Sequence, residues 1–303
     1  MGQLSQPPRL LDCHRLVLVQ AEVISWFEAN GRDLPWRRPG FTPWGSLVSE
    51  FMLQQTPVAR VLPKLEQWLS RWPTPAALAA DSPGDAVRAW DKLGYPRRAL
   101  WLHACAVAIV ERFDGQVPSS VDDLLSLPGI GPYTARAVAV FAFSAHEPVV
   151  DTNIRRVIAR HEKGLADQGA PKEKQDLADM DALLPHSDLS PVFNQAVMEL
   201  GALVCTSKSP SCGQCPISRS CAWLAAGSPA NAEGTKPKQK KYEGSDRQVR
   251  GAILSVLRES AHPVYATELA GAWPEETARS RALTSLLADG LIVLVDDDLF
   301  ALP

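Results

Sequence analysis

The chain has 303 residues, of which 46% are hydrophobic, and its formal net charge is −3. This length allows two or more domains, and the charge excludes a surface that is basic overall, so any contact with nucleic acid must be local. No apolar run is long enough to span a bilayer, and residues 1–11 lack the basic-then-apolar order of a secretory signal. We therefore expect a cytoplasmic protein with no membrane contact.

Nearly every segment up to about residue 225 has apolar residues at helical spacing. The expected helices cover residues 14–30, 44–56, 58–72, 74–90, 99–113, 122–127, 135–143, 172–184 and 191–204, with one more directly after Asp151. Residues 32–38 form an irregular, aromatic and basic stretch between the first two helices. This stretch is either a loop packed down by its tryptophan or a contact for a substrate.

Glu50 and Gln54 lie four residues apart in the second expected helix, so they share one face. Leu47 and Leu53 flank that face. A carboxyl group among apolar neighbours has its pKa raised by desolvation and can then act as a general acid near neutral pH. The alternative is an ordinary solvated glutamate on the surface.

A G-x-G turn, Gly129 to Gly131, lies between two expected helices. Two glycines let the backbone approach a ligand closely, and the N–H groups at the start of the following helix can bind a phosphate. This arrangement is the helix-hairpin-helix pattern, which holds a DNA backbone without reading its sequence.

Asp151 follows an extended apolar pair and precedes a helix. Aspartate is a favoured N-cap residue, and a catalytic carboxylate is the other interpretation. The two roles are compatible, because the positive end of the helix favours the ionised carboxylate.

Four of the six cysteines occur in one short loop with the spacing C-x6-C-x2-C-x5-C, namely Cys205, Cys212, Cys215 and Cys221. Thiolates bind zinc or iron–sulfur clusters, and structural zinc sites usually have two C-x2-4-C pairs rather than one. We therefore favour one 4Fe–4S cluster, with zinc as the alternative. Disulfides do not suit a cytoplasmic chain. Cys13 and Cys105 are expected to be ordinary packed thiols.

The C-terminal part changes character. Residues 225–245 are rich in glycine, proline and lysine, which indicates a flexible basic linker. The tail is expected to have helices over residues 249–257, 266–270 and 275–289, then strands over residues 291–295 and 299–301. This order suggests a small winged-helix-like module, and three acidic turn residues, Asp296 to Asp298, argue against a wing that enters a DNA groove.

Together these motifs resemble the endonuclease III superfamily of base-excision DNA glycosylases over about residues 15–225. Residues 32–37 and 49–56 are similar to the MutY-type adenine glycosylases, as are residues 193–195 and 199–202. The tail is similar to that of short actinobacterial members. The resemblance implies a mostly α fold: a six-helix barrel with the helix-hairpin-helix over residues 38–146 and an iron–sulfur cluster domain over residues 147–225. The N-terminal helix and pocket loop, residues 1–37, would pack with the cluster domain, and a linker over residues 226–245 would lead to the tail over residues 246–303.

The resemblance also implies roles for single residues. Glu50 would protonate adenine and help to activate water, Asp151 would stabilise the sugar cation, Tyr133 would assist at the sugar, and Asn153 would orient Asp151. Substrate or DNA contacts would come from Arg32, Trp36, Gln54, Gln55, Tyr95, Gly129, Gly131 and Gln195. In lyase relatives a lysine stands at the position of Tyr133, so we expect hydrolysis without strand cleavage.

The expected function is removal of adenine paired with 8-oxoguanine or guanine in double-stranded DNA, with one 4Fe–4S cluster per chain. A thymine or oxidised-pyrimidine glycosylase is the alternative enzyme, and a non-catalytic DNA-binding protein is the alternative from another class. Two departures from the adenine glycosylase pattern bear on specificity: Thr152 replaces a glycine, and the tail is too short for a Nudix-like domain. We expect a monomer in the cytoplasm, associated with the nucleoid.

Overall fold

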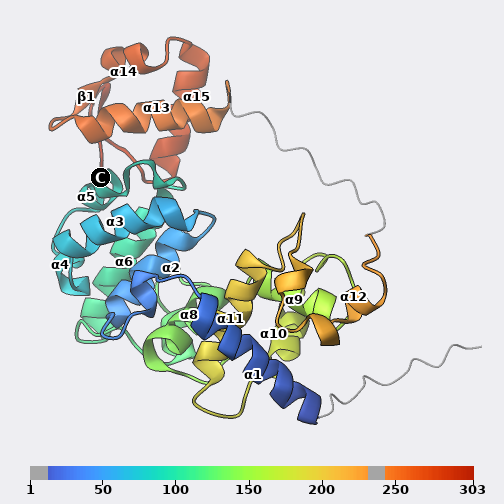
Figure 1. Cartoon of the computed structure of the whole chain (residues 1–303). Coiled ribbons are helices and arrows are strands. Elements are labelled where there is room, and N and C mark those ends of the chain that lie inside the picture. The colour runs from blue at the N-terminus through green and yellow to red at the C-terminus, as the bar shows by residue number, and fades with distance from the viewer. Residues whose placement is uncertain (1–12, 231–242) are drawn as a thin grey trace, which may run out of the picture. The chain divides into compact units, whose positions relative to one another are not determined.

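The computed structural model describes residues 13–230 and 243–303, and it is mostly helical, as expected (Figure 1). The chain divides into two compact units. The first unit contains residues 13–39 and 139–230, and the second contains residues 40–138 and 243–303. The linker expected over residues 226–245 lies largely outside the described residues. In the part of the chain that is described, no helix is both long and apolar enough to cross a membrane.

The first unit is built around helix α11, which packs against α1 and α9. Its helices are α1 (Cys13–Asn30), α9 (Thr152–His161), α10 (Glu173–Asp181), α11 (Ser190–Leu203) and α12 (Ala222–Ala225), with short 3-10 turns η1 (Pro35–Arg37), η3 (Cys212–Gln214) and η4 (Ser218–Ser220). Apolar side chains from α1, α9 and α11, among them Val23, Ile154 and Phe193, form its core. Gly201 allows α11 to approach α9 closely, because a Cβ there would lie 2.7 Å from the Cβ of Asn153.

In the second unit, α6 packs against α2, α4 and α5. The helices before residue 144 are α2 (Pro43–Leu53), α3 (Val58–Arg71), α4 (Pro75–Ala79), α5 (Pro83–Trp90), α6 (Arg97–Arg112), α7 (Val121–Leu125) and α8 (Pro132–Phe143), with the 3-10 turn η2 (Asp91–Leu93). Three buried tryptophans pack edge to face, with the ring of Trp68 4.6 Å from that of Trp72 and 5.6 Å from that of Trp90.

Two of the expected helices differ from the structure. The helix expected over residues 74–90 is two helices, because Ser82 caps α5 with its side chain and Pro83 occupies the first turn. The helix expected to run to residue 56 ends at Leu53, and Gln55 then takes a left-handed φ of 54°.

The C-terminal segment, residues 243–303, contains α13 (Asp246–Glu259), α14 (Ala266–Ala272), α15 (Glu276–Ala288) and a sheet of three strands (Figure 1). The strands β1 (Val264–Tyr265), β2 (Val293–Asp296) and β3 (Leu299–Ala301) are antiparallel in the order β1-β3-β2. Val264 pairs with Phe300, and Leu294 pairs with Phe300 from the other side. Both expected strands are present, whereas β1, with two residues, is too short to show a pattern in the sequence.

Candidate active site

Glu50 lies in the last turns of α2, where its side chain is buried. It is 7% exposed, and its neighbours Leu47 and Phe51 are fully buried. The helix begins at Pro43 and is capped by Thr42, whose hydroxyl accepts a hydrogen bond from the Gly45 N–H at 3.0 Å. The interpretation of Glu50 as a solvated surface residue is therefore wrong, because the structure has a buried carboxyl group at this position.

The turn after α2 carries Gln54 and Gln55, and the turn before α6 carries Tyr95. Gln55 and Tyr95 have φ angles of 54° and 48°, which non-glycine residues seldom adopt. Both side chains are exposed, and Tyr95 retains 54% of its accessible surface. Gln54 donates to the Thr134 hydroxyl at 3.4 Å. Strained exposed residues of this kind are typical of functional sites.

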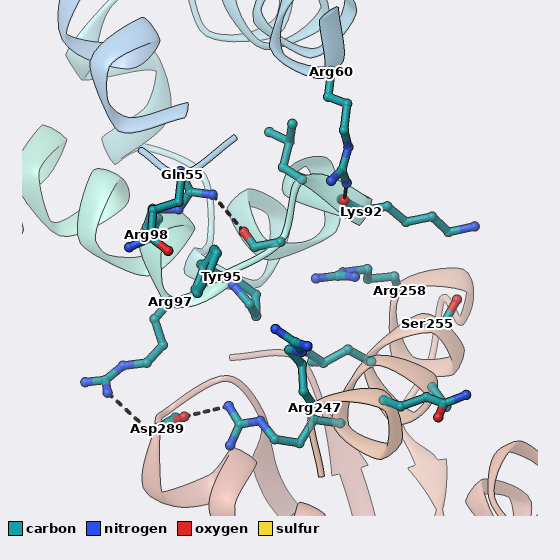
Figure 2. Close-up of a pocket in the computed structure, with 18 of the residues that line it drawn as sticks. Gln55, Arg60, Lys92, Tyr95, Arg97, Arg98, Arg247, Ser255, Arg258 and Asp289 are labelled. Atoms are coloured by element: carbon teal, nitrogen blue, oxygen red, sulfur yellow. Dashed lines mark hydrogen bonds and ion pairs between the residues drawn. The ribbon is translucent and has the colours of Figure 1, made fainter. Parts of the chain in front are cut away.

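A buried arginine, Arg98, joins these two turns. Its guanidinium donates to the Gln54 carbonyl at 2.7 Å, to the Thr56 hydroxyl at 3.0 Å and to the Gly94 carbonyl at 3.0 Å. It also lies 5.5 Å from the ring centroid of Tyr95 (Figure 2). Burial lowers the pKa of Arg98 to about 10, so the group stays charged at neutral pH. Arg98 therefore fixes the positions of Gln55 and Tyr95 relative to each other.

The expected G-x-G turn joins α7 to α8. Gly129 has a φ of 76°, and a Cβ there would lie 2.6 Å from the Cβ of Trp101, so both conformation and packing require glycine. At Gly131 a Cβ would meet nothing within 4 Å. The open space beside Gly131 suits the approach of an external group, and Tyr133 lies half-buried in the first turn of α8.

Asp151 is the N-cap of α9, in the first unit. Its Oδ1 accepts from the Ile154 N–H at 2.7 Å, and its Oδ2 accepts from the Asn153 amide at 2.8 Å. Asn153 in turn accepts from Arg156 at 2.7 Å. Burial raises the pKa of Asp151, and the hydrogen bonds from Ile154 and Asn153 oppose that rise. The carboxylate thus caps α9 and is itself oriented and partly desolvated, whereas the helix end alone led us to expect an easily ionised group.

Arg32 is held by a buried carboxylate on α11. Its Nε and Nη2 donate to Glu199 at 2.8 and 2.7 Å, and its backbone N–H donates to the same group at 2.9 Å. Arg37 adds two further hydrogen bonds at 3.1 and 2.9 Å. The pKa of Glu199 falls to about 2 because these hydrogen bonds outweigh its burial. Trp36 lies half-buried between the two arginines in sequence, and Gln195 is half-buried on α11.

The four cysteines of the C-x6-C-x2-C-x5-C loop line a single small cavity of about 30 Å³. Arg160 also lines it, and its Nη1 donates to the Cys205 Sγ at 3.4 Å. Burial raises the pKa of Cys215 to about 12. Within residues 13–230 and 243–303, no three His, Cys, Asp or Glu side chains converge closely enough to hold one metal ion. Cys105 is buried, as expected, whereas Cys13 at the start of α1 is exposed, so the expectation of a packed thiol there is wrong.

The model of the HhH-GPD superfamily of base excision DNA repair proteins matches residues 48–180. Over 282 residues the chain is 54% identical to an adenine DNA glycosylase of Mycobacterium tuberculosis, and the match covers 93% of this chain and 92% of that protein. The chain belongs to the adenine DNA glycosylase family of this superfamily. Another family member, from Mycolicibacterium smegmatis, is 55% identical over 93% of this chain and 94% of its own length.

Among solved structures, a thermostable thymine-DNA glycosylase is similar to this chain with a TM-score of 0.65 and 24% identity. The similarity covers 71% of this chain and 98% of that one. At this identity it supports a shared fold only. The family resemblance predicted from the motifs is confirmed by the superfamily model and by the 54% identity to an adenine DNA glycosylase.

Three positioning residues were missed by the sequence analysis: Glu199, Arg98 and Arg156. Each is a charged residue in a helix at a position that faces the core, being 1%, 3% and 6% exposed. A charge among apolar helical neighbours was the available signal, since buried charges are rare unless paired. Their partners lie up to 167 residues away along the chain, so no local pattern could identify them.

Proposed function

We propose that this member of the adenine DNA glycosylase family removes adenine from duplex DNA where it is paired with 8-oxoguanine or guanine. The observation that carries the proposal is 54% identity to an adenine DNA glycosylase over nearly the whole of both chains. Two carboxyl groups support the proposal: Glu50, which is buried, and Asp151, which caps α9 and accepts a hydrogen bond from the Ile154 N–H.

The reaction is hydrolysis of the bond between adenine and deoxyribose. A base within a duplex is out of reach, so the nucleotide is turned out of the stack into a pocket. Glu50 protonates the adenine ring, which makes it a better leaving group, and then assists the attacking water. Asp151 stabilises the positive charge that develops on the sugar, with Asn153 orienting it and Tyr133 assisting. Two carboxyl groups divide the work in glycoside hydrolysis in the same way.

The remaining contacts divide into a pocket and a DNA interface. Arg32 and Trp36 line the adenine pocket, and the buried Glu199 holds Arg32 in place. Gln55 and Tyr95 enter the base stack near the lesion, an assignment supported by their exposure and left-handed backbone. Gln54 and Gln195 contribute further contacts, and the turn at Gly129 and Gly131 holds a phosphate through backbone N–H groups.

We infer that the four loop cysteines hold one 4Fe–4S cluster. Their shared cavity supports this assignment. Cys205, Cys212, Cys215 and Cys221 would hold the cluster through their thiolates. The C-x6-C-x2-C-x5-C spacing has one C-x2-C pair, whereas a structural zinc site usually has two, so it suits a cluster better than a single zinc ion. Base hydrolysis requires no electron transfer, so the cluster supports the loop, with Arg160 donating toward one thiolate.

The architecture that we propose follows the family. Residues 38–146 are a six-helix barrel with the helix-hairpin-helix, and residues 147–225 are the cluster domain, joined by the N-terminal residues 1–37. Residues 226–245 are a basic linker, and residues 246–303 are a winged-helix-like module. We further propose a monomer that works at the nucleoid in the cytoplasm.

The test is single-turnover release of adenine from duplexes that pair A with 8-oxoguanine or with G. Duplexes with a T opposite G and with thymine glycol are measured beside them, and the Glu50→Gln protein is the inactive control. Rapid release from the adenine duplexes alone supports the proposal. Cutting of thymine glycol without release of adenine would overturn it in favour of a pyrimidine glycosylase.

A further inference from the structure

A large basic cleft lies within the second unit, between the turns that carry Gln55 and Tyr95 and the helix α13 (Figure 2). Its volume is about 1220 Å³. The cationic side chains that line it are Arg60, Lys92, Arg97, Arg98, Arg247, Arg250 and Arg258, whereas Asp289 is the one carboxylate among its lining residues. Such a one-sided charge is unusual in a chain whose net charge is −3.

The α13 wall of the cleft is held to α5 by two arginines. Arg88 donates from α5 to the carbonyls of Arg258 and Ser260 at the end of α13, the second at 2.8 Å. In return, Arg258 donates to the Val87 carbonyl on α5 at 3.2 Å. Gly84 lies against the last residues of the chain, where a Cβ would be 2.4 Å from the Pro303 carbonyl oxygen. The cleft therefore has two walls that are fixed to each other.

The single carboxylate neutralises little of this charge. Asp289 forms an ion pair with Arg97 of one wall, with an N–O distance of 3.2 Å, and a second ion pair with Arg250 of the other wall. Lys92 and Arg247 have exposed side chains on opposite walls. Clefts lined by one sign of charge focus the electrostatic field and attract ions of the opposite sign.

The size and position of the cleft identify its occupant. Pockets for small molecules have volumes of roughly 300–1,000 Å³, so this larger cleft, whose charged side chains are cationic except for Asp289, suits a segment of an anionic polymer. Gln55 and Tyr95, the residues proposed to enter the base stack, belong to its lining. A strand that passes these residues would bring its phosphates between Lys92 and Arg247.

We propose that this cleft binds the sugar-phosphate backbone of the duplex, so that the C-terminal segment extends the DNA interface beyond the helix-hairpin-helix. The inference rests on the proposed function in that DNA is the substrate. The segment meets the DNA through the basic face of α13. The acidic turn, Asp296 to Asp298, is absent from the lining, so the sequence-based argument against a wing that enters a groove is compatible with this contact.

The experiment measures the affinity for an undamaged duplex by fluorescence anisotropy at several salt concentrations. Lys92→Gln removes one charge from the barrel-side wall, and Arg247→Gln removes one from α13. The control is the double variant Arg71→Gln, Arg281→Gln, which removes two exposed charges outside the cleft, one from each part of the unit. Unaltered circular dichroism and melting are required of every variant.

Each lost phosphate contact is expected to make the negative slope of log K against log salt shallower by about 0.9, so a variant with both Lys92→Gln and Arg247→Gln should be shallower by about 1.8. The control is expected to keep the slope of the unaltered protein. Equal slopes for the cleft variants and the control overturn the proposal. A slope lowered by Lys92→Gln but not by Arg247→Gln also overturns it, because α13 then makes no contact.

This readout is independent of catalysis. Because the duplex is undamaged, the slopes test the cleft even if the protein fails to release adenine. Conversely, normal slopes for the cleft variants with rapid adenine release would remove the cleft proposal and leave the proposed function intact.

Discussion

Glu199 accepts hydrogen bonds from both Nε and Nη2 of Arg32, at 2.8 and 2.7 Å, while its own side chain is 1% exposed. The pair connects α11 to the loop that precedes η1. Arg32 therefore presents to its surroundings a guanidinium that is already oriented. An arginine held in this way loses less side-chain entropy when it meets a ligand.

Replacing Glu199 should damage the first unit. In Glu199→Gln two arginines lose their carboxylate, and breaking a buried ion pair costs about 3–5 kcal/mol. The free energy of unfolding, measured by urea denaturation at pH 7, should fall by about that amount. Asp33→Asn is the matched control, because the ion pair of Asp33 with Arg38 is exposed and should contribute little.

The same variant has a defined pH dependence. The pKa of Glu199 is lowered to about 2, so its stabilising contribution is present above the ordinary glutamate pKa and disappears as the pH falls toward 2. The difference in stability between the unaltered protein and Glu199→Gln should therefore shrink between about pH 5 and pH 2. A difference that stays constant over this range would contradict the assignment.

Arg98→Lys should slow base release more than it disturbs the fold. Lysine keeps the charge but lacks the planar fork that reaches the Gln54 and Gly94 carbonyls together. The turns of Gln55 and Tyr95 would then move independently, and we expect single-turnover release to slow by roughly tenfold or more, because small misplacements have large kinetic costs. Arg112→Lys, at an exposed position at the other end of α6, is the control and should stay near the unaltered rate.

Asp151→Asn should abolish excision while leaving duplex binding largely intact. We expect the rate to fall by roughly 10²–10⁴-fold, which is typical for a catalytic group. Asparagine is also a good N-cap, so α9 should persist. Asp188→Asn, the same change at an exposed aspartate of the first unit, is the control in both the excision and the binding assay.

The pH dependence of stability gives a second test of Asp151. Its pKa is raised by burial, so the folded state holds its proton more tightly than the unfolded state. Relative to Asp151→Asn, the unaltered protein should therefore lose stability as the pH rises through and above the ordinary aspartate value of about 3.9. Stability that rises over this window would mean that the hydrogen bonds from Ile154 and Asn153 dominate over burial.

If the cysteine loop holds a cluster, loss of one cysteine should reduce both the visible absorbance and the thermal stability of the protein. Cys212→Ala should remove the visible absorbance of an iron–sulfur cluster and lower the melting temperature, because metal binding is coupled to folding. Cys13→Ala, at an exposed cysteine outside the loop, should change neither. Elemental analysis that finds zinc in place of iron and sulfide would favour zinc, the alternative metal.

The chain should act without a lyase step. Tyr133 stands where a lysine would form a Schiff base, so borohydride should trap no strong covalent protein–DNA adduct. A lyase relative treated in parallel is the positive control. A strong adduct from this protein would indicate that another amine attacks the sugar.

Motifs made of neighbouring residues were predictable from the sequence. The cap at Asp151, the cysteine spacing and the glycine turn each depend on a few consecutive positions, and the structure has Asp151 capping α9 and the four cysteines around one cavity. The break between α4 and α5 also has a local signal, the capping residue Ser82 followed by Pro83. We nevertheless expected one helix, because apolar residues have helical spacing on both sides of the break.

Long-range pairs could not be predicted in this way. Glu199 and Arg32 are 167 residues apart, and nothing near either residue indicates the other. The turn geometry at Gln55 and Tyr95 depends on Arg98 of α6, which donates to main-chain carbonyls and to the Thr56 hydroxyl. Such contacts are created by the packing of α2 against α6, which periodicity alone does not define.

The contact between Arg88 and the end of α13 has an evolutionary consequence. Arg88 binds main-chain carbonyls, which every residue possesses, so the positions that provide them are free to drift without weakening the contact. Methods that infer proximity from co-varying positions report side-chain pairs and would miss it. Among relatives, the attachment of the C-terminal segment should therefore be traced by retention of the arginine on α5 rather than by similarity of the helix that it holds.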